Sequence, residues 1–376
     1  MRKPALHLSL YEQIKHHIIS EIELEHLLPH DKLPSENELT QQFSVSRITV
    51  KKAMSDLVKM GIVYRIQGKG TYVAVAMPDK GAPAAETPIR PKSAPAIALL
   101  LPFINNQHNA LLINGVESVL SDAGYSLLIC NTENSIQKEE RVIREMVERK
   151  VAGMIIYPVD GESYNREILQ LTLGSFPLVV MDRYLRGIDT NCVCPDNLLG
   201  AQEGVNYLIS LGHRNIGFLS TTIRGTTSIE DRLTGYEKAL AEHQIPIDRR
   251  YRYVDIELGD PKPIKEKIRD FLTKHAELTA IFAINPGLGL QVIKVASEMG
   301  LRVPEDLSLI FFGDFELSEF YSVRPTFISQ EDNMLGKEAA NLLISVIENP
   351  EQKTRKLFFP PKLIIRESTA NPGSRS

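Results

Sequence analysis

Four residues with cationic or hydrogen-bonding side chains lie close together in the run VSRITVKKAM. They are Arg47, Thr49, Lys51 and Lys52. Apolar residues recur in the same segment at helical spacing, which predicts a helix over residues 47–59 with one buried face. The four polar side chains fall on the other faces of that helix. Such donors on an exposed helix face are suited to phosphates and to the edges of base pairs.

Two further signals frame this segment. Before it, in LPSENEL, Ser35 and Glu38 have the spacing of a capping box, which predicts the start of another helix. After it, the runs VYRI and TYVAV flank a glycine-bearing tip and predict a two-stranded hairpin. The three signals together predict a winged helix-turn-helix domain over residues 1–75.

Charge is distributed unevenly along the 376 residues. The formal net charge is −4, but the segment from Val45 to Tyr72 carries six basic residues against the single acid Asp56. This local excess is typical of a surface that contacts DNA; a solvated helix face is the alternative on charge alone. The whole chain is 43% hydrophobic and 24% charged, which fits two or three folded domains.

The cysteines and the N-terminus exclude several classes of protein. Cys130, Cys192 and Cys194 lack the spacing of a disulfide framework or a zinc site, and we interpret them as packing thiols. The N-terminus has no apolar signal core, and no run approaches the ~20 apolar residues of a membrane span. We therefore expect a cytoplasmic protein with no membrane partner, no metal and no cofactor.

The rest of the chain predicts a linker and an α/β domain. Residues 76–95 contain five prolines and almost no large apolar groups, as in an interdomain linker. From residue 96 onward, helical patterns alternate with the apolar runs IALLL, YSLLIC, GMIIY, PLVVMD, IGFL, AIFAI and SLIFF. Such alternation predicts parallel sheets covered on both faces. Two such series in residues 96–376 indicate two doubly wound lobes with a cleft for a small ligand.

The first 75 residues resemble the DNA-binding domain of the GntR family of bacterial regulators. LPSENEL, VSRITVKKA and QGKGTYV occur in that family's order and spacing. The resemblance implies a recognition helix in the major groove of duplex operator DNA and a wing in the minor groove. The DNA-binding residues that it implies are Ser35, Asn37, Ser46, Arg47, Thr49, Lys51, Lys52, Gln67, Gly68 and Lys69.

Within that set the side chains are expected to divide the work. Arg47 can form a bidentate pair with guanine, whereas Lys51, Lys52 and Lys69 are suited to hold phosphates. Asn37 stands where several members of the family carry an arginine. We therefore expect a different target sequence.

The remaining residues resemble the effector-binding core of LacI/GalR-type repressors and periplasmic binding proteins. The resemblance is carried by IALLLPFINNQHNALLINGVE, PLVVMDR, PDNLLGAQEGVNYLISLGHRNIGFLS, RLTGYEKAL and LRVPEDLSLIFFGD. This fusion of two domain types resembles the arabinose-responsive repressors of Gram-positive bacteria. It implies a homodimer whose hold on DNA depends on a small molecule, expected to be a sugar that releases the operator.

The same resemblance implies a ligand set drawn from loops at the ends of strands. Its members are His108, Asn109, Asp182, Arg183, Ser228, Arg232, Asn285, Asp314 and Gln330. These side chains suit a polyol, because carboxylates accept hydrogen bonds from hydroxyls, arginine donates, and amides do both. Phe103 or Phe315 could offer an apolar face to a sugar ring. The alternative is that Asp182, Asp314 and Asn285 only cap turns and helices.

Departures from the family pattern leave other functions open. Pro286 stands where the family commonly has an aspartate that grips the ligand, and Phe311 replaces a usual glycine. The effector could therefore be something other than a sugar, or the site could be lost. An enzyme with a fused DNA-binding head is a further alternative, but the sequence shows no P-loop, no nucleophile elbow and no metal cluster.

Overall fold

The computed structural model describes residues 9–24, 26–66, 69–74, 94–161, 165–221, 225–254, 261–314 and 322–373. The chain divides into two compact units, Met1–Arg90 and Pro91–Ser376. Nearly all of the predicted linker, residues 76–95, lies outside the described residues, as do Gln67, Gly68 and Phe315.

The described residues of the first unit form three helices and an antiparallel hairpin. Its elements are α1 (Leu10–Glu23), α2 (Glu36–Phe43), α3 (Arg47–Lys59), β1 (Val63–Ile66) and β2 (Gly70–Val73). The predicted α2, α3 and hairpin are confirmed. Val50, Ala53, Met54 and Leu57 of α3 are buried against α1 and α2. The opposite side of α3 is therefore left to solvent.

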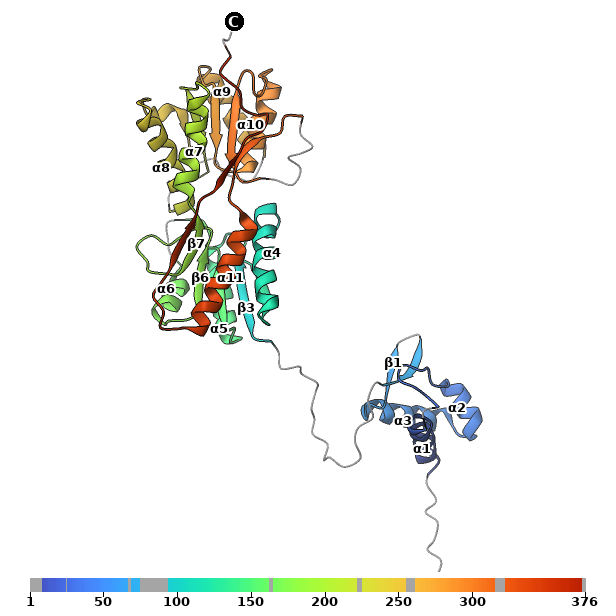
Figure 1. The fold of residues 1–376 in the computed structure, drawn as a ribbon. Coiled ribbons are helices and arrows are strands. Elements are labelled where there is room, and N and C mark those ends of the chain that lie inside the picture. The colour runs from blue at the N-terminus through green and yellow to red at the C-terminus, as the bar shows by residue number, and fades with distance from the viewer. Residues whose placement is uncertain are drawn as a thin grey trace, which may run out of the picture. The chain divides into compact units, whose positions relative to one another are not determined.

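The second unit holds two lobes, each built on a six-stranded sheet (Figure 1). The first sheet is parallel throughout and has the order β13-β7-β6-β5-β3-β4. Its strands are β3 (Ala96–Leu101), β4 (Ser126–Asn131), β5 (Gly153–Ile156), β6 (Leu178–Met181), β7 (Cys192–Pro195) and β13 (Lys356–Phe359). Its helices are α4 (Gln107–Asp122), α5 (Ile136–Glu148), α6 (Arg166–Leu173) and α11 (Asp332–Glu348).

The second sheet has the order β14-β12-β11-β10-β8-β9, in which only β14 runs antiparallel to its neighbour. Its strands are β8 (Ile216–Leu219), β9 (Arg252–Tyr253), β10 (Ala280–Ala283), β11 (Ser308–Phe312), β12 (Thr326–Ser329) and β14 (Lys362–Ile364). Helices α7 (Asn197–Ser210), α8 (Thr227–Glu242), α9 (Pro261–Lys274) and α10 (Pro286–Glu298) accompany it, with a short 3-10 turn at Arg249–Tyr251. The predicted fold class, two doubly wound α/β lobes, is confirmed.

The chain crosses between the lobes three times, from β7 to α7, from β12 to α11 and from β13 to β14. Figure 1 shows α11 lying beside α4 in the lobe of β3, although α11 follows a strand of the other lobe. Strands β7, β9, β12, β13 and β14 lie at or near sheet edges and were not among the predicted runs. Among the described residues, no helix is long and apolar enough to cross a membrane.

Two glycines let α4 and α11 approach backbone to backbone. A Cβ added at Gly115 would lie 2.1 Å from the carbonyl oxygen of Asn333, and one at Gly336 would lie 2.3 Å from that of Leu112. Real Cβ atoms essentially never come so close to another atom. Helix α11, which follows the second crossover, is therefore packed against α4 by contacts that a residue larger than glycine at position 115 or 336 would prevent.

We predict that Gly336→Ala lowers the free energy of unfolding by about 1–3 kcal/mol, because the added methyl group forces the two helices apart. Urea unfolding followed by circular dichroism measures the change. Glu117→Ala, at an exposed position of α4, is the control. Equal stability of the Gly336 and Glu117 variants would contradict the close approach.

Candidate functional site

The start of α3 is fixed by a serine cap. Ser46 Oγ accepts a hydrogen bond from the Thr49 backbone at 3.3 Å and lies 2.9 Å from Thr49 Oγ1. In the same way, Ser35 caps α2 and donates its backbone N–H to Glu38 at 2.6 Å, which completes the predicted capping box. Three of the predicted DNA-binding residues therefore already hold helix ends in the free protein.

Basic side chains surround a groove between α2, α3 and the hairpin. Glu36 at the start of α2 pairs with Arg65 of β1 at 2.5 Å and lies 4.0 Å from Arg47 Nε. The groove is lined by Lys32, Asn37, Arg47, Arg65 and Lys69, among others. Lys51 and Lys52 are exposed on α3. Lys32 and Arg65 were not in the predicted DNA-binding set, although Arg65 belongs to the basic excess between Val45 and Tyr72. Their positions follow from the folding of the hairpin onto α2.

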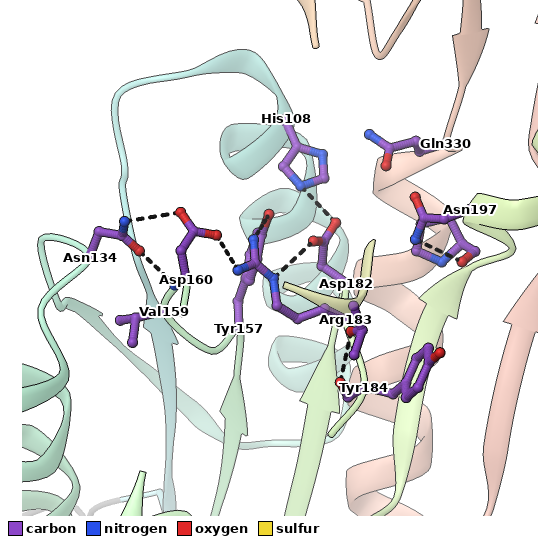
Figure 2. Close-up of polar contacts among 12 residues, drawn as sticks. His108, Asn134, Tyr157, Val159, Asp160, Asp182, Arg183, Tyr184, Asn197 and Gln330 are labelled. Atoms are coloured by element: carbon purple, nitrogen blue, oxygen red, sulfur yellow. Dashed lines mark hydrogen bonds and ion pairs between the residues drawn. The ribbon is translucent and has the colours of Figure 1, made fainter. Parts of the chain in front are cut away.

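In the second unit, His108 lies between two carboxylates, those of Asp182 and Asp332; Figure 2 shows its contact with Asp182. Its Nε2 is 3.1 Å from Asp182 at the end of β6, and its Nδ1 is 3.0 Å from Asp332 at the start of α11. Burial alone would lower the pKa of His108, but the two carboxylates outweigh it and raise the pKa to about 10. Burial alone would raise the pKa of Asp182, but His108 and Arg183 outweigh it and lower the pKa to about 2.

Arg183 extends the same polar network. Its guanidinium contacts Asp160 at 2.5 Å and the Tyr157 hydroxyl at 3.2 Å, and it lies 4.8 Å from the centre of the Tyr157 ring. Asp160 is held in turn by Asn134 through two hydrogen bonds of 2.9 and 3.0 Å (Figure 2). The neighbouring backbone at Asp182 has a φ of 68°, a left-handed conformation that aspartate tolerates better than most residues. Strain of this kind is common at functional sites.

Arg232 of α8 is buried, and within the described residues its guanidinium donates to three neutral oxygens. It donates to Asn197 Oδ1 at 2.8 Å, to the Ile284 carbonyl at 2.7 Å and to Gln330 Oε1 at 2.8 Å. Burial lowers its pKa to about 10. Asn197 follows β7 and Gln330 follows β12, so one guanidinium joins two of the three crossovers.

Direct contacts also connect the lobes beside this network. Thr227 of α8 donates to the Tyr184 carbonyl at 2.8 Å, and the Tyr184 hydroxyl donates to Asp231 at 3.2 Å. Arg186, in the same loop as Tyr184, pairs with Glu230 at 3.0 Å. The loop after β6 is thus attached to the first turns of α8.

The four remaining residues of the predicted ligand set make different contacts in the structure. Asn109 is buried and donates to the Phe103 carbonyl at 2.7 Å, and Asn285 caps α10 by accepting from Leu288 at 2.9 Å. Asp314 lies 3.9 Å from Arg366, and Ser228 is buried in the first turn of α8. The capping alternative therefore describes Asn285, whereas Asp182 belongs to the polar network.

Several buried polar atoms near His108 have no hydrogen-bond partner. Within the part of the chain that the structure describes, they include Gln107 Oε1, Asn109 Oδ1 and Arg183 Nε. Buried polar groups are nearly always bonded to protein or water, and exceptions call for an explanation. Gln107 and Asn109 lie in the first turn of α4, and Arg183 Nε lies 3.9 Å from Asp182, which contacts His108. A polar molecule bound here would supply the missing partners.

Comparisons with known proteins agree with this architecture. Residues 10–73 match the bacterial regulatory proteins of the gntR family, and residues 205–369 match a periplasmic binding protein-like domain. The chain is 32% identical to an arabinose metabolism transcriptional repressor of Halalkalibacterium halodurans over 97% of both chains. It is also 32% identical to one of Geobacillus stearothermophilus over 96% of this chain and 97% of the relative. The chain belongs to this family of transcriptional repressors.

Solved structures show the same fold in the effector unit. A LacI family transcriptional regulator from Enterococcus faecium, solved with bound ribose, is 24% identical and superposes with a TM-score of 0.64. The match covers 73% of this chain and 99% of the chain of that regulator. The transcription regulator CcpA of Lactococcus lactis, 20% identical, gives a TM-score of 0.67 over 73% of this chain and 99% of its own. At sequence identities this low, the similarity shows a shared fold and nothing further.

Four residues of the polar network around His108 lie outside the ligand set predicted from the sequence. Tyr157, Asp160, Gln107 and Asp332 were not predicted, although Tyr157 and Asp160 follow the apolar run of β5. Residues at the carboxyl end of a parallel strand are natural candidates for ligand contacts. Asp332 offers no such signal, because only the packing of α11 on α4 brings it to His108.

We predict that the ion pair of His108 gives this regulator a stability that depends on pH. The folded pKa of His108 is raised to about 10, so its contribution is complete below the unfolded value of about 6.5 and is lost as the pH rises toward 10. Asp182 contributes above its unfolded value of about 3.9 and loses its effect as the pH falls toward 2. His108→Gln should therefore cost ~3 kcal/mol of unfolding free energy between these limits.

Urea unfolding of the two proteins at a series of pH values measures this difference. It should be largest at about pH 5–6 and shrink steadily toward pH 10. His16→Gln, at an exposed position of α1, should follow the unmodified protein throughout. A difference that does not vary with pH would show that His108 is neutral in the folded protein.

Proposed function

We propose that this repressor binds duplex operator DNA as a homodimer and releases it when a sugar occupies the cleft around His108. The observation that supports this proposal is the group of buried polar atoms without a hydrogen bond on Gln107 and Asn109 of α4 and on Arg183, beside the ion pairs of His108. A ligand rich in hydroxyl groups can both donate and accept hydrogen bonds, so it can satisfy carboxylate, amide and guanidinium groups together.

The charges of the cleft favour an uncharged ligand. His108 and Arg183 are each paired with carboxylates of Asp182, Asp332 or Asp160. An additional charge on the ligand would disturb a network that is already compensated. Phe103, which is 42% exposed, offers an apolar surface for ring carbons. The arabinose repressors among the relatives make a pentose the first candidate.

The two departures from the family pattern, Pro286 and Phe311, lie in and beside α10, outside the polar network around His108. Asn285 caps α10, Pro286 occupies its first position, and Gly289 faces Phe311, whose ring leaves no room for a Cβ. The phenylalanine therefore fills the space that Gly289 leaves. We assign the ligand contacts primarily to His108, Asp182, Arg183, Arg232 and Gln330.

The path from ligand to DNA would run through the crossovers. Arg232 joins Asn197 and Gln330, and Asp332 lies two residues beyond Gln330 in the same connection. A ligand that bonds to Arg232 or His108 changes the contacts of the segments that set the angle between the lobes. Release of DNA requires that this ligand prefer one lobe arrangement over the other.

We predict that L-arabinose raises the melting temperature of the full chain. At about 100 times the dissociation constant, the stabilisation corresponds to ~2.7 kcal/mol by mass action. D-ribose, D-xylose and D-glucose are measured in parallel by thermal shift. Arg183→Lys should weaken binding of the stabilising sugar about tenfold because lysine lacks the planar fork of donors. Arg141→Lys, at an exposed position of α5, should not. Stabilisation by none of the sugars would point to another effector class or a lost site.

We also predict that Arg47→Ala weakens specific operator binding at least about tenfold, as expected from the loss of a bidentate base contact. Binding is measured by fluorescence anisotropy with a duplex selected by the unmodified protein. The same variant should keep its full thermal shift with the stabilising sugar, because Arg47 belongs to the other unit. Loss of both responses would contradict separate reading and sensing units.

A further inference from the structure

We infer that Ile48 reads the methyl group of a thymine in the major groove and so helps to determine the operator sequence. This inference rests on the DNA-binding role of the family and goes beyond the charged contacts assigned above. Ile48 is the second residue of α3, and 80% of its surface is exposed. In helix-turn-helix proteins, residues near the start of the recognition helix contact base edges.

The position of Ile48 on the helix explains its exposure. At 3.6 residues per turn, it lies roughly opposite the buried stripe of Val50, Ala53, Met54 and Leu57. It therefore contributes nothing to the core of the unit. A β-branched residue is also a poor choice for an exposed helical position, because it loses side-chain freedom there without gaining contacts. Neither packing nor helix stability accounts for an isoleucine at this place.

The neighbours of Ile48 indicate what it contacts. Lys51 and Lys52, one turn further along the same face, are both exposed. Arg47 precedes it, with a side chain that is 72% exposed. The apolar side chain is thus surrounded by cations that suit the phosphates on both sides of a groove. The C5 methyl of thymine is the apolar group that base pairs present in the major groove.

The hydroxyl groups beside Ile48 are already engaged. Ser46 and Thr49 lie 2.9 Å apart through their hydroxyls, and Ser46 also caps the helix. Their capacity to read bases is reduced by these local bonds. An apolar contact from Ile48 would therefore distinguish between bases at the start of α3, where Ser46 and Thr49 are less available to do so.

Matched duplexes with thymine or uracil test this inference, because the two bases pair identically and differ only in the methyl group. The operator is first obtained with the full chain by selection from random duplexes. Each thymine of a half-site is then replaced in turn by deoxyuridine, and the dissociation constants are compared. We expect one replacement in each half-site to weaken binding about fourfold, the loss expected when one methyl group leaves an apolar contact.

Variants of Ile48 identify the side chain that senses the methyl group. Ile48→Ala should bind the thymine operator several-fold more weakly and respond little to uracil at that position. Ile48→Val, which keeps a branched side chain, should retain most of the response. Val58→Ala serves as the control, because Val58 is a 38% exposed aliphatic residue in the last turn of the same helix. It should behave like the unmodified protein.

Three outcomes would overturn the inference. They are unchanged binding after every replacement by uracil, an unchanged uracil response in Ile48→Ala, and a selected operator without thymine in its half-sites. Failure to enrich any sequence would instead remove the DNA-reading role itself, and the inference with it. Loss of specific binding in Arg47→Ala, together with insensitivity to uracil, would leave the DNA-binding role standing and reject Ile48 alone.

Discussion

The arrangement of the effector unit depends on the buried guanidinium of Arg232. It bonds to one residue from each of two crossovers and to a backbone carbonyl at the end of β10. A buried charge is costly unless its donors are satisfied, so these bonds constrain where the crossovers can lie. A change at Arg232 therefore alters the ends of two crossovers, including the connection that leads to Asp332 and His108.

The two units divide recognition in physically different ways. The DNA-binding unit offers exposed cations and one exposed isoleucine on a helix whose other side is fully packed. The effector unit instead buries the side chains of His108, Asp182 and Arg183 and pairs them with carboxylates or with one another. Exposed cations suit a long polyanion that replaces their counterions. Paired buried groups suit a small neutral molecule that must compete with existing hydrogen bonds.

Much of the fold could be predicted from the sequence because its central strands are continuous apolar runs. Strands β3, β5, β6, β8, β10 and β11 all carry this signal. Strand β7, CVCP, is short and ends in proline, and β13, KLFF, alternates between exposed and half-buried residues. Such strands at or beside a sheet edge are defined by their pairing partners, which the local sequence does not record. The candidate site could also be predicted only in part. The resemblance to LacI/GalR-type repressors implied His108, Asp182 and Arg183, whereas Asp332 reaches His108 through the packing of α11 on α4.

The last two strands have a consequence for how the protein is made. Strand β13 completes the edge of one sheet beside β7, and β14, two residues later, completes the edge of the other beside β12. During synthesis on a ribosome, both lobes therefore wait for residues 356–364 before either sheet is complete. The DNA-binding unit contains no such late segment and can fold as soon as it emerges. The DNA-binding unit of the nascent regulator can thus fold before the unit that carries the candidate effector site.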